Sequence, residues 1–152
     1  MKRTIRRARD GSFQVRLTDD ERDLVADLAA QLRDLLVSED TDGLERLYPP
    51  AYANDPERDS EYRDMVHDEL LQKRLAAVDV VEQTAAAKTL TEEQVTAWMG
   101  AINDLRLVLG TRLDVTEDQD FPALDDPSAP AFAVYQYLTH LLAEIVHALS
   151  RG

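Results

Sequence analysis

Residues 130–150 read PAFAVYQYLTHLLAEIVHALS, and this stretch decides the fold. It contains no Lys or Arg, and its apolar side chains recur at the spacing of a helix that buries most of its surface. Pro130 suits the first turn of a helix, where its missing N–H leaves no hydrogen bond unmade. The sequence therefore predicts a helix from about Pro130 to Ser150, which is typical of the central element of a helical domain.

Two capping-box patterns mark the starts of further helices. Thr18 precedes Glu21, and Thr91 precedes Gln94, at the spacing that lets each pair satisfy free N–H groups at a helix start. Gly110 is a natural place for the second of these helices to end, or for a neighbouring element to approach closely. Together with apolar residues at helical spacing, these signals predict helices over residues 18–37, 41–47, 60–87, 91–110 and 130–150.

Residues 3–17 predict a β-hairpin. Phe13, Val15 and Leu17 alternate with polar residues, as in a half-buried strand, and Asp10-Gly11 is a turn signal. A lone hairpin is marginal in water, so it should dock on the helices. The predicted fold is mainly α: one domain over 1–152, with a basic N-terminal hairpin or tail over 1–17 and a body over 18–150 that is a four- to five-helix bundle.

The charge is strongly lopsided. Thirty acidic residues face 17 basic ones, for a net charge of −13, and five of the basic residues lie within positions 2–9. The remaining chain repels phosphate backbones and anionic lipids. We therefore expect contact with nucleic acid only through residues 2–9, whose alternative is to lie against the acidic body, and we expect no membrane association. No apolar run follows the N-terminal charges, so no signal peptide is predicted.

The chain contains no cysteine, which excludes disulfides, thiolate nucleophiles, zinc–cysteine sites and thiol redox switches within it. This composition fits a reducing, cytoplasmic location. The five glycines are too dispersed to build a phosphate-binding loop, and neither G-x-S-x-G nor H-E-x-x-H occurs. The sequence therefore predicts no catalytic residue and no cofactor.

His140, Glu144 and His147 form the strongest metal-ligand pattern, because spacings of four and three place them on one helix face. The alternative is a polar stripe that faces solvent or hydrogen-bonding groups. No second element offers a fourth ligand, so no metal site is predicted; His67 with Asp64 and Asp68 is a weaker set. An enzyme would have to use His140 and Glu144 together with Arg106.

Two further segments stand out: RLYPPAY over residues 46–52, and NDLRLVLGTR over residues 103–112. In the second, Asn103, Arg106 and Gly110 share one face of the predicted helix. Arginines in so apolar a stretch need partners. They either tie helices together through carboxylates or present a cation to an acidic ligand or partner.

These two segments resemble an actinobacterial family known as domain of unknown function twenty-seventeen, and the resemblance extends over nearly the whole chain. It implies an intracellular protein of high-GC bacteria, with genes near that of the proteolytic adaptor ClpS and with some members labelled as transcription regulators. No catalytic residues are implied. The candidate family-motif surface comprises Arg46, Tyr48, Pro49, Pro50, Tyr52, Asn103, Asp104, Arg106, Gly110 and Arg112.

The expected function is that of a non-enzymatic regulatory or adaptor-like protein that binds another protein. One alternative is a transcription-associated regulator that uses residues 2–9 on DNA or contacts a polymerase component. A second alternative is an enzyme or metal-binding helical protein. A homodimer through the last helix is also open, because that helix carries so few charges.

Overall fold

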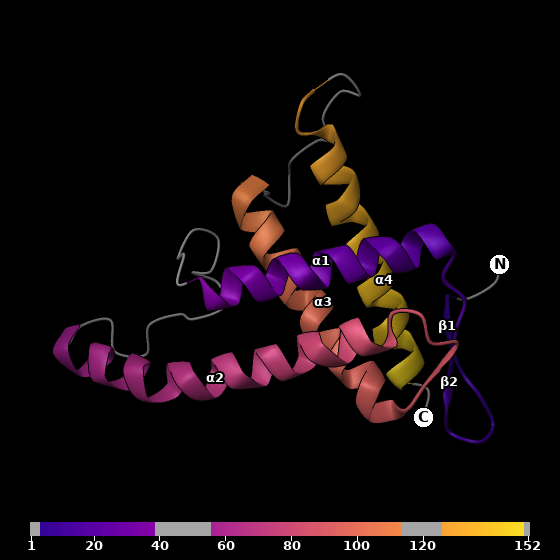
Figure 1. Cartoon of the computed structure of the whole chain (residues 1–152), viewed down its shortest axis with the longest axis horizontal. Helices are drawn as coiled ribbons and strands as arrows, with labels where there is room; N and C mark the ends of the chain where they lie inside the picture. Colours follow the sequence, from indigo (N-terminus) through magenta and orange to yellow (C-terminus); the bar gives the residue numbers. More distant parts are fainter. Residues whose placement is uncertain (1–3, 39–55, 114–125, 151–152) are drawn as a thin grey trace.

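The computed structural model describes residues 4–38, 56–113 and 126–150, apart from the side chains of residues 56–68 and 112. These residues form four helices and three short strands (Figure 1). The mainly α fold with an N-terminal hairpin is therefore confirmed. In chain order the elements are β1 (Ile5–Arg7), β2 (Phe13–Val15), α1 (Asp19–Val37), α2 (Pro56–Thr84), β3 (Thr89–Leu90), α3 (Glu92–Leu113) and α4 (Ala129–Ser150).

Helix α3 is the centre of the packing. It contacts α1, α2 and α4, whereas α4 packs mainly against α3 and β1. Trp98 of α3 is completely buried, and its indole N–H donates to Thr84 Oγ1 at 2.7 Å. The expectation that the last helix is central is thus wrong, although its predicted bounds are confirmed. Its exposed face carries the uncharged residues Ala133, Ala143 and Val146. Apolar side chains are common on protein surfaces, so the lack of charge on this helix does not require it to be buried.

The strands form a small antiparallel sheet in the order β1-β2-β3 at one end of the helices (Figure 1). Ile5, Phe13 and Leu90 point into the core and are almost completely buried. Gly11 in the hairpin turn has φ +89°, a conformation that glycine adopts without steric cost. The predicted hairpin is confirmed, and β3 is an addition that the sequence reading lacked.

Arg22 joins this sheet to the helices. Its guanidinium donates to the carbonyl of Val15 at 3.1 Å, and to those of Ala85 and Ala87 at 2.9 and 2.7 Å. One side chain on α1 therefore holds β2 and the connection between α2 and β3. This explains how so short a sheet keeps its place against the helices.

Both capping boxes form as predicted. Thr18 and Glu21 exchange side chain–backbone hydrogen bonds at the start of α1, and Thr91 and Gln94 do so at the start of α3. The predicted end at Gly110 is wrong, because α3 continues to Leu113. Among the described glycines, Gly11 alone has a positive φ, so Gly110 lacks the left-handed geometry of a helix stop. The helix predicted over 41–47 lies outside the described residues.

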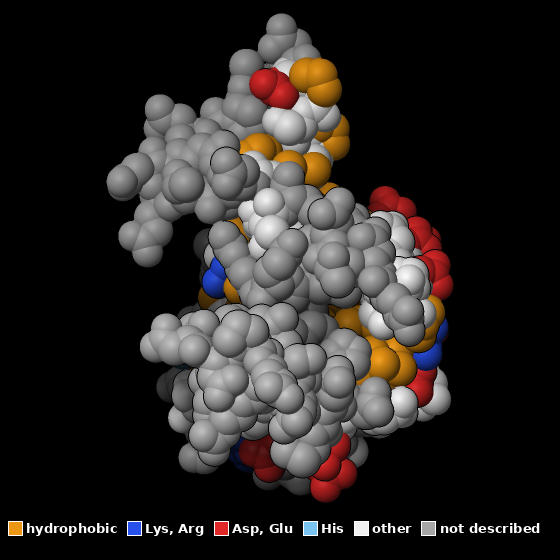
Figure 2. Space-filling model, turned by 90° about the vertical axis from the view of Figure 1, so that its left-hand side faces the viewer, with side chains coloured by type: hydrophobic (Ala, Val, Ile, Leu, Met, Phe, Trp, Pro, Cys, Tyr) orange, Lys and Arg blue, Asp and Glu red, His pale blue; other side chains and the backbone are white. Residues whose placement is uncertain are grey.

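None of the helices that the structure describes is long and apolar enough to cross a membrane. On the face shown in Figure 2, more of the charged surface is acidic than basic, and hydrophobic side chains are exposed between the charges.

Candidate functional site

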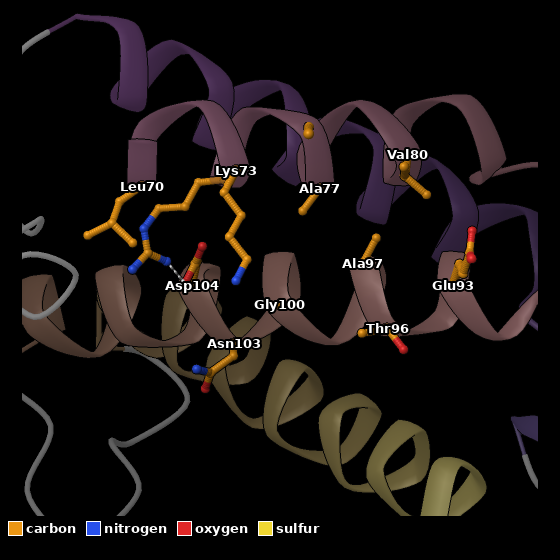
Figure 3. Close-up of a pocket in the computed structure, with 12 residues that line it drawn as sticks. Leu70, Lys73, Ala77, Val80, Glu93, Thr96, Ala97, Gly100, Asn103 and Asp104 are labelled. Carbon is orange, nitrogen blue, oxygen red and sulfur yellow. Dashed lines mark hydrogen bonds and ion pairs between the residues drawn. The ribbon is translucent and has the colours of Figure 1, made fainter. Parts of the chain in front are cut away.

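A groove with a volume of about 550 Å³ runs between α2 and α3. Figure 3 shows the two helices antiparallel, with α1 on the far side of α2 and the groove on the near side. Small side chains line its middle, with Ala76 and Ala77 on α2 and Ala97 and Gly100 on α3. Its volume falls in the range of ligand pockets, which spans roughly 300–1,000 Å³.

An ion pair lines one end of the groove, next to Leu70. Arg74 on α2 donates to Asp104 on α3 at 2.5 Å, and the Asp104 side chain is only 8% exposed. Burial raises the pKa of Asp104, and the hydrogen bond and charge of Arg74 offset this only in part. The ionised carboxylate is therefore costly here, and it depends on Arg74.

The rim carries charges of opposite sign at its two ends. Lys73 extends across the groove beside Asp104, and Glu93 lies at the opposite end of the α3 wall (Figure 3). Both side chains are exposed. Between them Gly100 faces open space, because a Cβ added there meets no atom within 4 Å among the described residues. The groove thus offers an apolar strip with the exposed Lys73 and the Arg74–Asp104 pair at one end and the exposed Glu93 at the other.

The family-motif residues divide between two faces of α3. Asn103 and Asp104 line the groove. Arg106 lies on the α4 side, where its guanidinium is 3.3 Å from Tyr135 Oη and 5.8 Å from the ring centre. The structure therefore separates Arg106 from the groove and places its guanidinium beside the Tyr135 side chain of α4. Gly110 is buried within α3.

The structure does not describe the side chains of the remaining family-motif residues. Arg46, Tyr48, Pro49, Pro50 and Tyr52 lie in the undescribed segment, and the side chain of Arg112 is not described.

The candidate metal ligands are not gathered into one site. His140 Nε2 is 3.8 Å from Glu144 Oε1, but the His140 side chain is mostly exposed while that of Glu144 is buried. His147 Nε2 is buried without a hydrogen-bond partner. Among the residues that the structure describes, no three His, Asp or Glu side chains are placed to hold a metal ion. His67, Asp64 and Asp68 have no described side chains.

The basic N-terminal residues are partly turned inward. Arg7 donates to the Leu149 carbonyl at the end of α4 at 3.2 Å, lies 3.5 Å from Glu92 and covers the Phe13 ring at 4.7 Å. Arg6 and Arg9 are exposed. At Arg7, then, the basic segment lies against the body, which was the alternative to contact with nucleic acid.

The sequence reading missed Lys73 and Arg74, which supply the α2 side of the groove. Both lie on a helix with charges of both signs, so neither stands out as a motif. An available signal was Asp104 itself, since an acidic residue amid the apolar residues of a helix requires a buried cation nearby.

The fold is that of a small, mainly helical domain, and the groove is a cleft between two of its helices with charged residues at both ends. The chain belongs to the family described as Domain of unknown function (DUF2017), whose model matches residues 2–149. The family resemblance noted in the sequence is therefore confirmed.

Similar curated proteins occur in mycobacteria. A Mycobacterium tuberculosis (strain ATCC 25618 / H37Rv) protein named oxidative stress regulator AosR is 39% identical over 82 residues. A protein of the same name in Mycobacterium bovis (strain ATCC BAA-935 / AF2122/97) matches equally. Each match covers 51% of this chain and 37% of the relative, so the matched region spans little more than a third of those proteins. No solved structure matches the chain.

Proposed function

We propose that this chain is a non-enzymatic regulatory protein that acts by binding another protein in the α2/α3 groove. The observation that carries the proposal is the groove itself: an apolar strip of small residues, open at Gly100 and bounded by Lys73 and Glu93. Exposed apolar surface rimmed by polar residues is typical of a protein-binding site.

The comparisons support a regulatory role. The mycobacterial relatives are named oxidative stress regulators, and they share 39% identity over about half of this chain. The residues of this chain supply no thiol, because it contains no cysteine. We infer that an oxidative signal, if it reaches this protein, does so through a partner rather than through a switch of its own.

Between adaptor and transcription regulator, the geometry favours action through protein contacts. Arg7 is engaged with Leu149, Glu92 and Phe13, which reduces the basic surface that residues 2–9 could offer to DNA. A transcription role is then more readily served by contact with a polymerase component. Direct DNA binding would weaken steeply with added salt and disappear when residues 1–9 are deleted.

The proposal is tested by complementation in the native host. A strain lacking the gene should show an altered transcript response to peroxide, which the wild-type gene restores. Gly100→Leu fills the groove and should fail to restore the response, whereas Ala30→Leu on the exposed side of α1 should succeed. An unaltered response in the deletion strain would contradict the regulatory role. Restoration by Gly100→Leu would contradict the assignment of the groove.

A further inference from the structure

We propose that the groove receives one α-helix of a net-basic partner protein, oriented by a carboxylate that faces Lys73 and a cationic side chain that faces Glu93. This inference rests on the proposed function and adds to it the structure and polarity of the partner. Four features of the groove lead to it: an open glycine, an elongated apolar floor, charges at both ends and the acidity of the surrounding body.

No close neighbour in the described structure requires a glycine at position 100. Gly100 lies in the interior of α3, where glycine is less favourable than alanine, and it has no positive φ that would require glycine. A Cβ there meets nothing within 4 Å. Glycine on an exposed helix face allows another backbone to approach closely. A partner helix packed closely against α3 therefore accounts for a glycine at this position.

The shape of the groove fits a helix. Its walls are two antiparallel helices, and its floor of alanine and glycine leaves room for the side chains of a third (Figure 3). From Glu93 to Asp104 the α3 wall is about three helical turns, or roughly 16 Å, long. Amphipathic helices bind in apolar grooves of this kind.

The charges at the two ends of the groove set the direction in which the partner helix binds. Lys73 has no ion pair among the described residues, and neither does Glu93, so both are available to a partner. A helix with an acidic and a basic side chain about three turns apart on one face places opposite charges together in one orientation. In the reverse orientation like charges meet, which is unfavourable.

The surrounding body selects the charge of the partner. At a net −13, the chain attracts a net-basic protein and repels a second copy of itself. Complementary charge of this kind accelerates association and suppresses wrong partners. A helix from a basic protein is therefore the occupant to which the whole surface is complementary.

The test uses the full chain and a phage-displayed library of helical peptides of about 15 residues, the length at which helices become stable in isolation. Selected peptides are synthesised, and their affinities are measured by fluorescence anisotropy. We expect them to be helical when bound and to carry acidic and basic residues about three turns apart. Gly100→Leu should weaken binding by about tenfold or more, and the control Ala30→Leu should leave it unchanged.

The charges are tested by reversal. Lys73→Glu should weaken binding about two- to fivefold, and replacing the acidic residue of the peptide with Lys should restore it. Failure to select a peptide, binding in an extended conformation, or affinities insensitive to Gly100→Leu would each overturn the inference. If these occur while Gly100→Leu still fails to complement in cells, the regulatory function stands and the helical occupant is wrong. If the peptides bind as expected but the deletion strain responds normally, the proposed function is the part that fails.

Discussion

Replacing Asp104 and Arg74 separately and together will measure what the ion pair at the end of the groove contributes. The Asp104 side chain is 8% exposed and that of Arg74 is 21% exposed. Breaking a fully buried pair destabilises a protein by about 3–5 kcal/mol. Because Arg74 keeps some contact with water, Asp104→Ala should reduce the free energy of unfolding by about 2–3 kcal/mol.

The double variant should behave differently. Burial raises the pKa of Asp104 in spite of Arg74. This indicates that the desolvation cost of the charged carboxylate exceeds the stabilisation that it gains from Arg74. Arg74→Met with Asp104→Leu should therefore be about as stable as the wild type, within roughly 1 kcal/mol. Urea denaturation followed by the fluorescence of Trp98, the single and buried tryptophan, will report each value. A double variant as unstable as the sum of the single variants would refute this reasoning.

The pH dependence gives the same pair a second test. A carboxyl whose folded pKa is raised binds its proton more tightly in the folded state, so folding loses stability as the pH rises through that pKa. For Asp104 this loss begins above its ordinary value of 3.8. The wild type should show this loss and Asp104→Asn should not. Identical pH profiles of the two proteins between pH 3 and 7 would show that burial does not raise this pKa.

Three other substitutions test other parts of the structure. Gly100→Ala should raise the free energy of unfolding by about 1 kcal/mol, measured as a higher thermal midpoint, because the added Cβ meets open space. Burial raises the pKa of Glu21, but hydrogen bonds from the Thr18 N–H and the Tyr137 hydroxyl lower it overall. Glu21→Gln should therefore destabilise by about 1 kcal/mol at pH 7, and the difference from wild type should shrink as the pH falls below about 4, which urea denaturation at both pH values checks. Arg7→Ala should speed amide hydrogen exchange in β1 and β2, because it removes the contacts with Leu149 and Phe13.

The sequence predicted those parts of the fold that depend on local chemistry. Both capping boxes need only two side chains three residues apart, and both form. The last helix was placed to within one residue, because Pro130 marks its first turn and no Lys or Arg interrupts its apolar pattern. The strand β3 was missed because two residues, Thr89 and Leu90, are too few to show an alternating pattern.

The site was less predictable, because it is made by packing between helices. Asn103 and Asp104 were named from the sequence, but nothing in the pattern showed that Arg106, two or three positions later, would turn toward α4. The burial of Glu144 beside an exposed His140 likewise depends on which face of α4 meets α3. Periodicity defines the faces of a helix, whereas the neighbours that cover them are set by the tertiary arrangement.

If the groove receives a helix as proposed, the position of the ion pair accounts for a costly buried charge at this site. An apolar pair in place of Arg74 and Asp104 would extend the hydrophobic floor and leave that end of the groove without a defined boundary. With the pair present, charged side chains beside Lys73 lie between Gly100 and the apolar Leu70 at this end of the groove (Figure 3). The proposed helix would have to bury apolar atoms against these charges to slide toward Leu70, which is unfavourable. Under the proposal, the pair fixes the register of the bound helix at the expense of some stability, as buried polar residues do in coiled coils.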